Sequence, residues 1–175
     1  GGGQLGSMLA SAAKKFKIQT IVLSDDLKAP AKNFCDEIII TDYKKIKKID
    51  DFINKVDLVT FEFENIPFKV LDYILKHKPI FPKPSINQLL QNRFTEKKFV
   101  NNEGIKTTNY VLIKNKSDIL DNETLLPGFL KTCTLGYDGK GQYIINNKDE
   151  IDDLNIDFKK EYIHAVFFKT ILSRR

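Results

Sequence analysis

The chain has 175 residues, enough for one large domain or about one and a half small ones. Its 42% hydrophobic and 29% charged residues exclude a disordered chain, and no apolar run approaches the roughly 18–20 residues of a membrane-spanning helix. The net charge of +5 comes from lysines interleaved with acids, which favours a solvated surface and phosphorylated small-molecule ligands over nucleic acid. We expect a cytoplasmic protein with no nucleic-acid or membrane partner, in which Cys35 and Cys133 are reduced.

The chain opens on glycines, and Gly1, Gly3 and Gly6 have the Gly-x-Gly-x-x-Gly spacing. Apolar residues at helical spacing follow, so the pattern predicts a helix that begins in the glycine turn. Such a turn can bind one phosphate through backbone N–H groups, or it can be a tight strand–helix connection; as a dinucleotide fingerprint it is weak. Because such a turn normally follows a β-strand, we expect the first strand to be missing from this chain.

Strands and helices then alternate. In chain order we predict a strand over 20–23, a strand over 37–41, a helix over 46–56, a strand over 57–63, a helix over 67–76 and a brief strand over 79–82. The alternation indicates a parallel, doubly wound sheet, with ligands at the carboxyl ends of its strands. The glycine turn and the turn over 62–65 would both lie at that end.

A long helix is predicted over 85–102, with Ser85 and Gln88 as a capping box and Gly104 as its stop. On this helix Arg93 and Lys97 are four residues apart and share one face. They place two cations where a nucleotide could approach, or they belong to an ordinary exposed flank.

After this helix the pattern is typical of a smaller α+β unit. We predict strands over 109–113, 128–132 and 142–145, and a short helix over 149–154. The predicted fold class is therefore α/β, with a Rossmann-like domain over 1–93 and a smaller α+β subdomain over 94–175.

Two carboxylates, Glu62 and Glu64, straddle Phe63 at the end of a predicted strand. They could accept hydrogen bonds from hydroxyl or amine groups of a ligand, or they could be surface acids at a turn. His77 and His164 have no partner pattern, and both are expected at the surface.

The segment 128–142 is the strongest functional signal. An apolar strand carries Lys131, and a loop follows that is rich in glycine and contains Tyr137, Asp138 and Lys140. Glycines let backbone N–H groups close on a polyanion and lysines neutralise it, so the pattern predicts a lid over nucleotide phosphates. The Walker spacing is absent, and a β-hairpin with a glycine-rich turn is the alternative. A lysine on a largely buried strand needs an anionic partner, either a phosphate or a carboxylate.

Four motifs, over 1–9, 60–67, 91–97 and 130–142, come in the order seen in the 5-(carboxyamino)imidazole ribonucleotide synthases, and the chain resembles that family over about residues 1–146. The family belongs to the ATP-grasp superfamily. The resemblance implies a Rossmann-like pre-ATP-grasp domain with a parallel sheet, followed by an incomplete ATP-grasp subdomain. It implies ATP-dependent carboxylation of 5-aminoimidazole ribonucleotide with bicarbonate, through carboxyphosphate, in purine biosynthesis. ATP and Mg²⁺ would be the cofactors, and a homodimer is one possible state of the full-length enzyme.

The resemblance also implies roles for individual residues. Tyr137 and Lys140 would lie nearest the bicarbonate and amine chemistry, and Glu62 and Glu64 near the ribose or ring of the ribonucleotide. The residues that would hold the ribonucleotide phosphate are Gln4, Leu5 and Gly6. The residues that would contact ATP are Arg93, Lys131, Gly136, Tyr137, Asp138, Gly139, Lys140, Gly141 and Gln142. No metal ligand is assigned in this chain.

The sequence departs from the family pattern in two places. Ser7 stands where the family commonly has arginine, so a phosphate contact could be lost, and the segment after about Glu161 does not resemble the expected adenine-binding hinge. The acidic Mg²⁺ ligands are expected beyond this chain, which should therefore be a partial enzyme with little or no turnover. Another ATP-grasp carboxylase or ribonucleotide transformylase, or a non-catalytic nucleotide-binding module, is the alternative. Exposed apolar surface at the lost strand and lost domain predicts marginal stability.

Overall fold

The computed structural model describes residues 1–136 and 141–166. The chain divides into two units, Gly1–Gln88 and Leu89–Arg175. The domain boundary expected after residue 93 stays a prediction. Among the described residues, no helix is long and apolar enough to cross a membrane.

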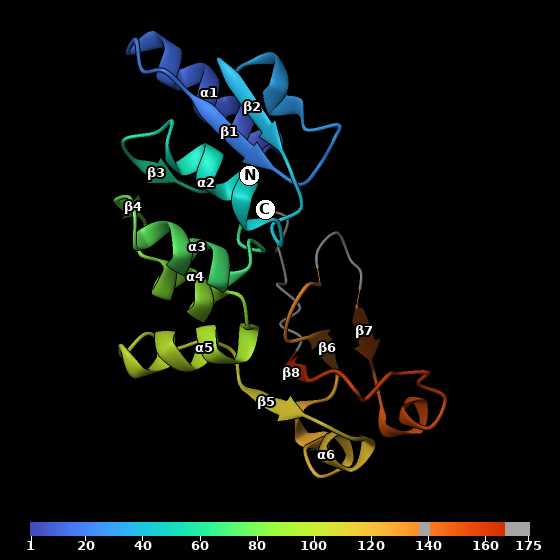
Figure 1. The fold of residues 1–175 in the computed structure, drawn as a ribbon. Coiled ribbons are helices and arrows are strands. Elements are labelled where there is room, and N and C mark those ends of the chain that lie inside the picture. Colours follow the sequence, from blue (N-terminus) through green and yellow to red (C-terminus); the bar gives the residue numbers. More distant parts are fainter. Residues whose placement is uncertain (137–140, 167–175) are drawn as a thin grey trace, which may run out of the picture. The chain divides into compact units, whose positions relative to one another are not determined.

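The first unit alternates strands and helices, as predicted (Figure 1). Its elements are α1 (Gln4–Lys15), β1 (Ile21–Ser24), η1 (Pro30–Asn33), β2 (Glu37–Ile40), α2 (Ile46–Ile53), β3 (Val59–Thr60), α3 (Phe68–Leu75), β4 (Ile80–Phe81) and α4 (Pro84–Leu90), within which the unit ends. Strand β3 is shorter than the predicted strand over 57–63. The chain bends into the turn that contains Glu62 instead of continuing the ladder.

The strands of this unit form two parallel pairs. Strand β1 pairs with β2 from Ile21↔Glu37 to Ser24↔Ile40, and β3 pairs with β4 through Val59↔Ile80. Each pair is parallel because a crossover, η1 in one case and α3 in the other, returns the chain to the start of the sheet. The predicted parallel sheet is therefore present as two two-stranded pieces.

One apolar cluster lies between these strands and two amphipathic helices. Its buried side chains come from one stripe of α2, one stripe of α3, and the strands and loops beside them: Leu23, Tyr43, Ile49, Phe52, Ile53, Val59, Ile66, Val70, Leu71, Ile74 and Ile80. The spacing of three and four residues in each helix puts these side chains on one face. Helix α1 contributes none of them.

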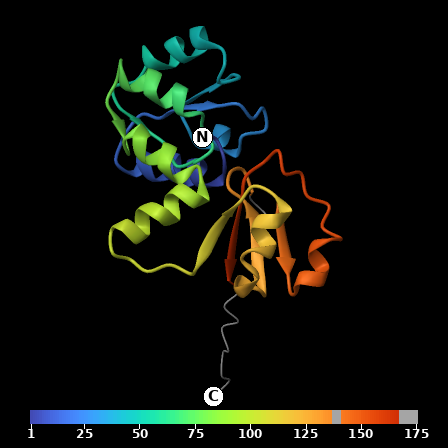
Figure 2. The ribbon, with the colours of Figure 1, turned by 90° about the horizontal axis from the view of Figure 1, so that it is seen from below.

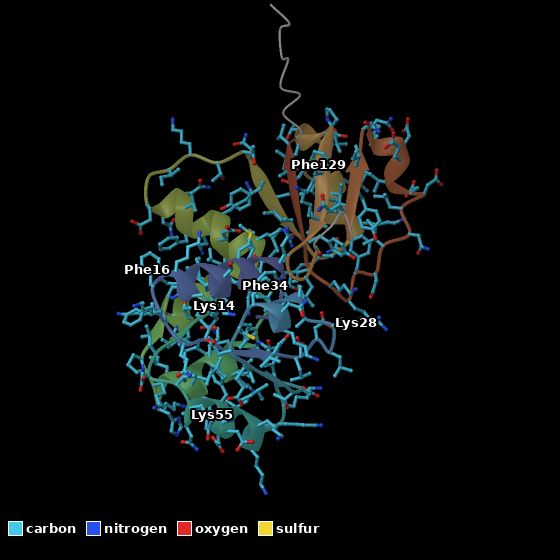
Figure 3. All side chains as sticks on the ribbon, turned by 90° about the horizontal axis from the view of Figure 1, so that it is seen from above. Lys14, Phe16, Lys28, Phe34, Lys55 and Phe129 are labelled. Carbon is cyan, nitrogen blue, oxygen red and sulfur yellow. The ribbon has the colours of Figure 1, made fainter. Side chains whose placement is uncertain are left out.

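Helix α1 is present, but its predicted apolar face lies in solvent. The exposed fractions of Leu5, Met8 and Leu9 are 59%, 61% and 47%, and the buried positions of the helix are Gly6, Ser7 and Ala10. Phe16, at the end of the helix, is 77% exposed (Figure 3). Sequence periodicity identified the helix correctly, but the described residues do not cover its apolar face.

The single long helix predicted over 85–102 is wrong, because two helices occupy this stretch. Helix α4 ends at Leu90, and α5 (Arg93–Asn102) begins anew after Asn92. The Asn92 side chain accepts hydrogen bonds from the backbone N–H of Phe94 at 2.9 Å and of Thr95 at 3.3 Å, which caps the second helix. Gly104, with φ of +80°, ends it as predicted.

The second unit is built on a four-stranded antiparallel sheet with the order β5-β8-β6-β7 (Figure 2). Its elements after α5 are β5 (Tyr110–Ile113), α6 (Lys116–Leu120), η2 (Glu123–Leu125), β6 (Gly128–Thr132), β7 (Gln142–Ile145), η3 (Lys148–Ile151) and β8 (Tyr162–Val166). The predicted strands are all present, η3 replaces the predicted short helix, and α6 was not predicted. Strand β8 begins directly after Glu161 and lies between β5 and β6 inside the sheet.

The two faces of this sheet differ in chemistry. One face carries the apolar cluster of Ile113, Ile119, Leu130, Ile145, Ile151 and Tyr162. His164 pairs directly with Leu130, so it lies on this face and is fully buried, and the expectation that it is a surface residue is wrong. The other face carries Phe129, Lys131 and Ile163.

Candidate functional site

A cavity of about 300 Å³ lies between helix α5 and the second face of the sheet. Its lining combines cations with apolar side chains and consists of Arg93, Glu96, Lys97, Thr108, Phe129, Lys131, Ile163, Ala165 and Val166. The structure therefore brings Arg93, Lys97 and Lys131 together around one cavity. Three basic groups around an apolar hollow suit a ligand with an aromatic part and an anionic part.

Lys97 is held inside this cavity rather than on an exposed flank. Its Nζ donates a hydrogen bond to Thr108 Oγ1 at 3.0 Å and lies 5.5 Å from the centre of the Tyr110 ring. Burial lowers the pKa of Lys97, and the nearby charge of Lys131 acts in the same direction, against the opposing effect of Glu96. An anion in the cavity would favour the charged lysine. Sequence reasoning left Lys97 out of the ATP contacts, although its i,i+4 relation to Arg93 was the signal.

Arg93 ties the start of α5 to the end of β6. Its backbone N–H donates to Cys133 O at 2.8 Å, its Nη1 donates to Thr132 O at 2.9 Å, and its Nη2 donates to Gly136 O. The guanidinium thereby fixes both ends of the segment that leads into the glycine-rich loop. Burial raises the pKa of Cys133 to about 11, so its thiol stays neutral at this junction.

Lys131 lies near the end of β6 and lines the cavity. Its Nζ lies 5.0 Å from the ring centre of Phe129, which is labelled in Figure 3. An aromatic face stabilises a cation only partly, so a phosphate or carboxylate remains the expected partner. Gln142 is directly opposite Lys131 in the β6–β7 ladder and lies on the same face.

The glycine-rich segment connects β6 and β7, which pair as an antiparallel hairpin. The predicted β-hairpin is therefore confirmed, and it does not exclude a lid over nucleotide phosphates. Gly141 has φ of +66°, and a methyl group there would lie 2.9 Å from Thr132 Cγ2. Both facts require glycine at this position. Tyr137, Asp138, Gly139 and Lys140 lie outside the described residues, so their roles stay predictions.

In the first unit, the glycine turn and Glu62 lie together. An ideal Cβ on Gly1 would be 2.7 Å from Glu62 Oε1, and one on Gly6 would be 3.2 Å from it. This oxygen is buried and has no hydrogen-bond partner among the described residues. Burial, assisted by the charges of Asp25 and Glu62, raises the pKa of Tyr43. A buried acceptor with no donor is the chemistry expected of a group that binds a ligand hydroxyl or amine.

Of the other residues predicted at this turn, Gln4 and Leu5 are exposed and Gly6 is buried. Helix α1 begins at Gln4, so the N–H groups of Gln4, Leu5 and Gly6 are in its first turn, where an anion can bind. The hydroxyl of Ser7 donates to Gly3 O at 2.9 Å and is turned inward, so it does not replace an arginine. Glu64 is exposed.

The described residues contain no cluster of His, Cys, Asp or Glu side chains that could hold a metal ion.

A parallel α/β unit with a glycine turn, followed by an antiparallel unit with a basic cavity beside a glycine-rich hairpin, is an arrangement of the ATP-grasp class. Residues 1–91 match the ribonucleotide synthetase preATP-grasp domain, and residues 98–168 match the ATP-grasp domain. The chain therefore belongs to the ribonucleotide synthetase preATP-grasp domain family. The match to residue 168 also corrects the expected end of the resemblance at about residue 146.

Relatives with similar sequences agree with this family, and those described below share one enzyme name. The N5-carboxyaminoimidazole ribonucleotide synthase of Brucella melitensis biotype 1 is 37% identical over 163 residues, which is 89% of this chain and 43% of that protein. The enzyme of the same name from Bacillus subtilis strain 168 is 33% identical over 154 residues, 87% of this chain and 40% of that protein. The resemblance inferred from four motifs is confirmed.

Solved structures show the same fold. The N5-carboxyaminoimidazole synthetase from Staphylococcus aureus complexed with ADP superposes with a TM-score of 0.87 at 33% identity, over 96% of this chain and 46% of that chain. The carboxyaminoimidazole ribonucleotide synthase from Aspergillus clavatus complexed with ATP gives a TM-score of 0.82 at 25% identity, over 97% and 46%. This chain thus spans less than half the length of the relatives it matches.

Proposed function

We propose that this chain is part of an N5-carboxyaminoimidazole ribonucleotide synthase. The proposed reaction uses ATP and bicarbonate to carboxylate the amine of 5-aminoimidazole ribonucleotide through carboxyphosphate, with release of ADP and phosphate, in de novo purine biosynthesis. The observation that carries the proposal is the convergence of Arg93, Lys97 and Lys131 on a cavity beside the glycine-rich hairpin. The names of the relatives supply the substrate class.

In this proposal the second unit binds ATP. Lys97 and Lys131 offset the charge of the phosphates, and the apolar side chains of the cavity contact the remainder of the nucleotide. Arg93 holds the base of the hairpin and directs its remaining donors to the nucleotide. The loop from Gly136 to Gln142 closes over the phosphates, and Tyr137 and Lys140 lie nearest the bicarbonate and amine.

The first unit binds the ribonucleotide in this proposal. The backbone N–H groups of Gln4, Leu5 and Gly6 hold its phosphate at the start of α1. The unpartnered Glu62 oxygen accepts a hydrogen bond from the ribose or the ring, and Glu64 lies nearby. Acidic ligands for Mg²⁺ come from outside the described residues. We further propose a cytoplasmic enzyme, with homodimer formation a property of the full-length protein.

The nucleotide site is tested by titrating the chain with ADP in a calorimeter. Lys131→Met and Lys97→Met each remove a cation from the cavity, so each should weaken binding about tenfold or more. The matched control is Lys159→Met, which removes an exposed lysine outside the cavity and should leave the affinity unchanged. Equal affinities in all three variants would exclude this cavity as the nucleotide site.

The reaction is tested with a chimera in which residues 1–166 replace the matching part of the Bacillus subtilis relative. We expect ADP release that requires both 5-aminoimidazole ribonucleotide and bicarbonate. Release that requires formate instead would indicate a transformylase. ADP binding without any release, in a chimera that is folded by circular dichroism, would favour a non-catalytic nucleotide-binding module.

A further inference from the structure

One face of helix α5 is packed against the segment that leads into strand β5. Phe94, Lys97 and Asn101 lie three and four residues apart along the helix, so they share this face. Each of them contacts the segment 107–110. The chain leaves the helix at Gly104 and returns along it before β5 begins (Figure 1). The face therefore determines where this segment lies beside the basic cavity.

The side chain of Asn101 holds the segment at two points. Its carboxamide oxygen accepts a hydrogen bond of 3.0 Å from the Thr107 N–H, and its amide nitrogen donates to Tyr110 Oη at 3.4 Å. The Phe94 ring packs edge-on against the Tyr110 ring, with the ring centres 5.7 Å apart. These contacts fix Thr107 and Tyr110 against the helix, and with them Thr108, which lies between them in the chain.

Lys97 is the charged member of this helix face. Its Nζ donates to Thr108 Oγ1 at 3.0 Å and lies 5.5 Å from the centre of the Tyr110 ring. Lys97 and Thr108 are both half-buried, and both line the cavity. A lysine has a flexible four-carbon stem, so a bond to a fixed hydroxyl restricts where its ammonium lies. Because an ammonium has three donors, the bond to Thr108 does not exhaust its capacity to bind a ligand oxygen.

The surroundings of Lys97 make the hydroxyl bond important for its charge. Arg93 and Lys131 add two cations to the cavity, Glu96 adds one carboxylate, Tyr110 faces Lys97 from β5, and β8 contributes apolar side chains. Burial lowers the pKa of Lys97, Glu96 opposes this effect, and Lys131 adds to it. A hydroxyl oxygen that accepts a hydrogen bond from Nζ favours the charged form of the lysine.

We propose that Thr108 is a positioning residue of the nucleotide site, whose hydroxyl oxygen holds the Lys97 ammonium at the place in the cavity where it binds phosphate oxygens. The inference rests on the proposed function of this cavity. Thr108 acts through Lys97, so loss of its hydroxyl should weaken nucleotide binding only when Lys97 is present.

The test is a double-substitution cycle measured by calorimetric titration with ADP at pH 7.5. Thr108→Val keeps the shape of the side chain and removes the acceptor, so it should weaken binding about fivefold or more. Thr108→Ser keeps the oxygen and should retain most of the affinity. In the Lys97→Met chain, Thr108→Val should cause no further loss. The control is Thr107→Val, which removes a hydroxyl outside the cavity lining and should leave the affinity unchanged.

The outcomes separate this inference from the proposed function. If Lys97→Met weakens binding and Thr108→Val does not, the positioning role is overturned and the nucleotide site remains. An equal loss from Thr108→Val with and without Lys97 has the same meaning. If Lys97→Met leaves the affinity unchanged, the inference fails, and if Lys131→Met does so too, the proposed nucleotide site fails with it.

A second measurement needs no nucleotide. The pKa of Lys97 is obtained by NMR titration of its isotope-labelled Cε, whose signal is identified by its absence in Lys97→Met. Loss of the acceptor disfavours the charged ammonium, so Thr108→Val should lower the pKa of Lys97 and Thr108→Ser should not. The affinity for ADP lost in Thr108→Val should then grow between pH 7.5 and pH 9.5, because binding needs the charged lysine. An unchanged pKa of Lys97 in Thr108→Val overturns the proposal.

Discussion

At the residue scale, buried positions depend on partners that lie far away in the sequence. Gly128, at the start of β6, illustrates this dependence. A methyl group there would lie 2.4 Å from His164 Nε2, 2.7 Å from Leu125 O and 2.8 Å from Ala165 O. The glycine is needed because an imidazole from another strand occupies the space of its side chain.

Gly128→Ala should therefore destabilise the second unit by about 1–3 kcal/mol, because two of the three close contacts are backbone oxygens that cannot move aside. Urea unfolding monitored by circular dichroism measures the loss. Gly3→Ala is the control, since a methyl group at Gly3 meets no atom within 4 Å and its cost should stay below about 1 kcal/mol. Equal losses in the two variants would contradict the packing of His164 over Gly128.

His164 should also make the second unit sensitive to acid. Both ring nitrogens are buried and have no hydrogen-bond partner among the described residues, and burial lowers the pKa of His164 below its ordinary value of 6.5. As the pH falls below about 6.5, His164 binds a proton in the unfolded chain but stays neutral in the folded chain. The free energy of unfolding therefore decreases.

His164→Leu should remove this part of the pH dependence, as measured by urea unfolding between pH 7.5 and pH 5. His77→Gln, which changes an exposed histidine, should keep it. If the wild-type chain and His164→Leu lose stability in parallel over this range, the buried neutral imidazole is not the cause.

At the element scale, a local side chain decides where one helix becomes two. The apolar spacing over 85–102 predicts a continuous helix. However, the Asn92 side-chain oxygen accepts hydrogen bonds from two backbone N–H groups, which in a continuous helix would donate to carbonyl oxygens of the preceding turn. The break places Arg93 in the first turn of α5, from which its guanidinium reaches Thr132 O and Gly136 O. The cap therefore positions a residue of the proposed ATP site.

Asn92→Ala should destabilise α5 by about 1 kcal/mol, and Asn92→Asp should restore most of the loss, because a carboxylate also caps a helix. Amide exchange of Phe94 and Thr95 is the measurement, with faster exchange expected in the alanine variant. If alanine and aspartate behave alike, the capping interaction contributes little, and the helix break has another cause.

At the scale of the whole molecule, each of the two units carries one half of the proposed chemistry. The first has a glycine turn beside an unpartnered carboxylate oxygen, and the second has three basic side chains beside a hairpin. The first unit also exposes Leu5, Met8, Leu9 and Phe16 and contains a cavity of about 440 Å³ between β1 and β3. Marginal stability of the chain, expected from its sequence, stays a prediction for which these exposed apolar groups are the physical reason.

Several features of this protein follow from local sequence. Helical periodicity predicted α1, α2 and α3, and the β-rich runs predicted β1, β2, β6 and β7 within a residue or two, because amphipathic patterns report which side of an element must be covered. Four ordered motifs identified the family. The i,i+4 spacing of Arg93 and Lys97 indicated one basic helix face, which lines the cavity.

Other features depended on the tertiary structure. Strand β8 lies between two strands that are distant in the sequence, and only that pairing buries His164 and places Ile163 on the cavity side. The short β3, the inward turn of the Ser7 hydroxyl and the cavity between β1 and β3 likewise depend on which segments meet in space. Periodicity identifies the face of an element that needs covering, whereas the residues that cover it are determined by contacts between distant segments.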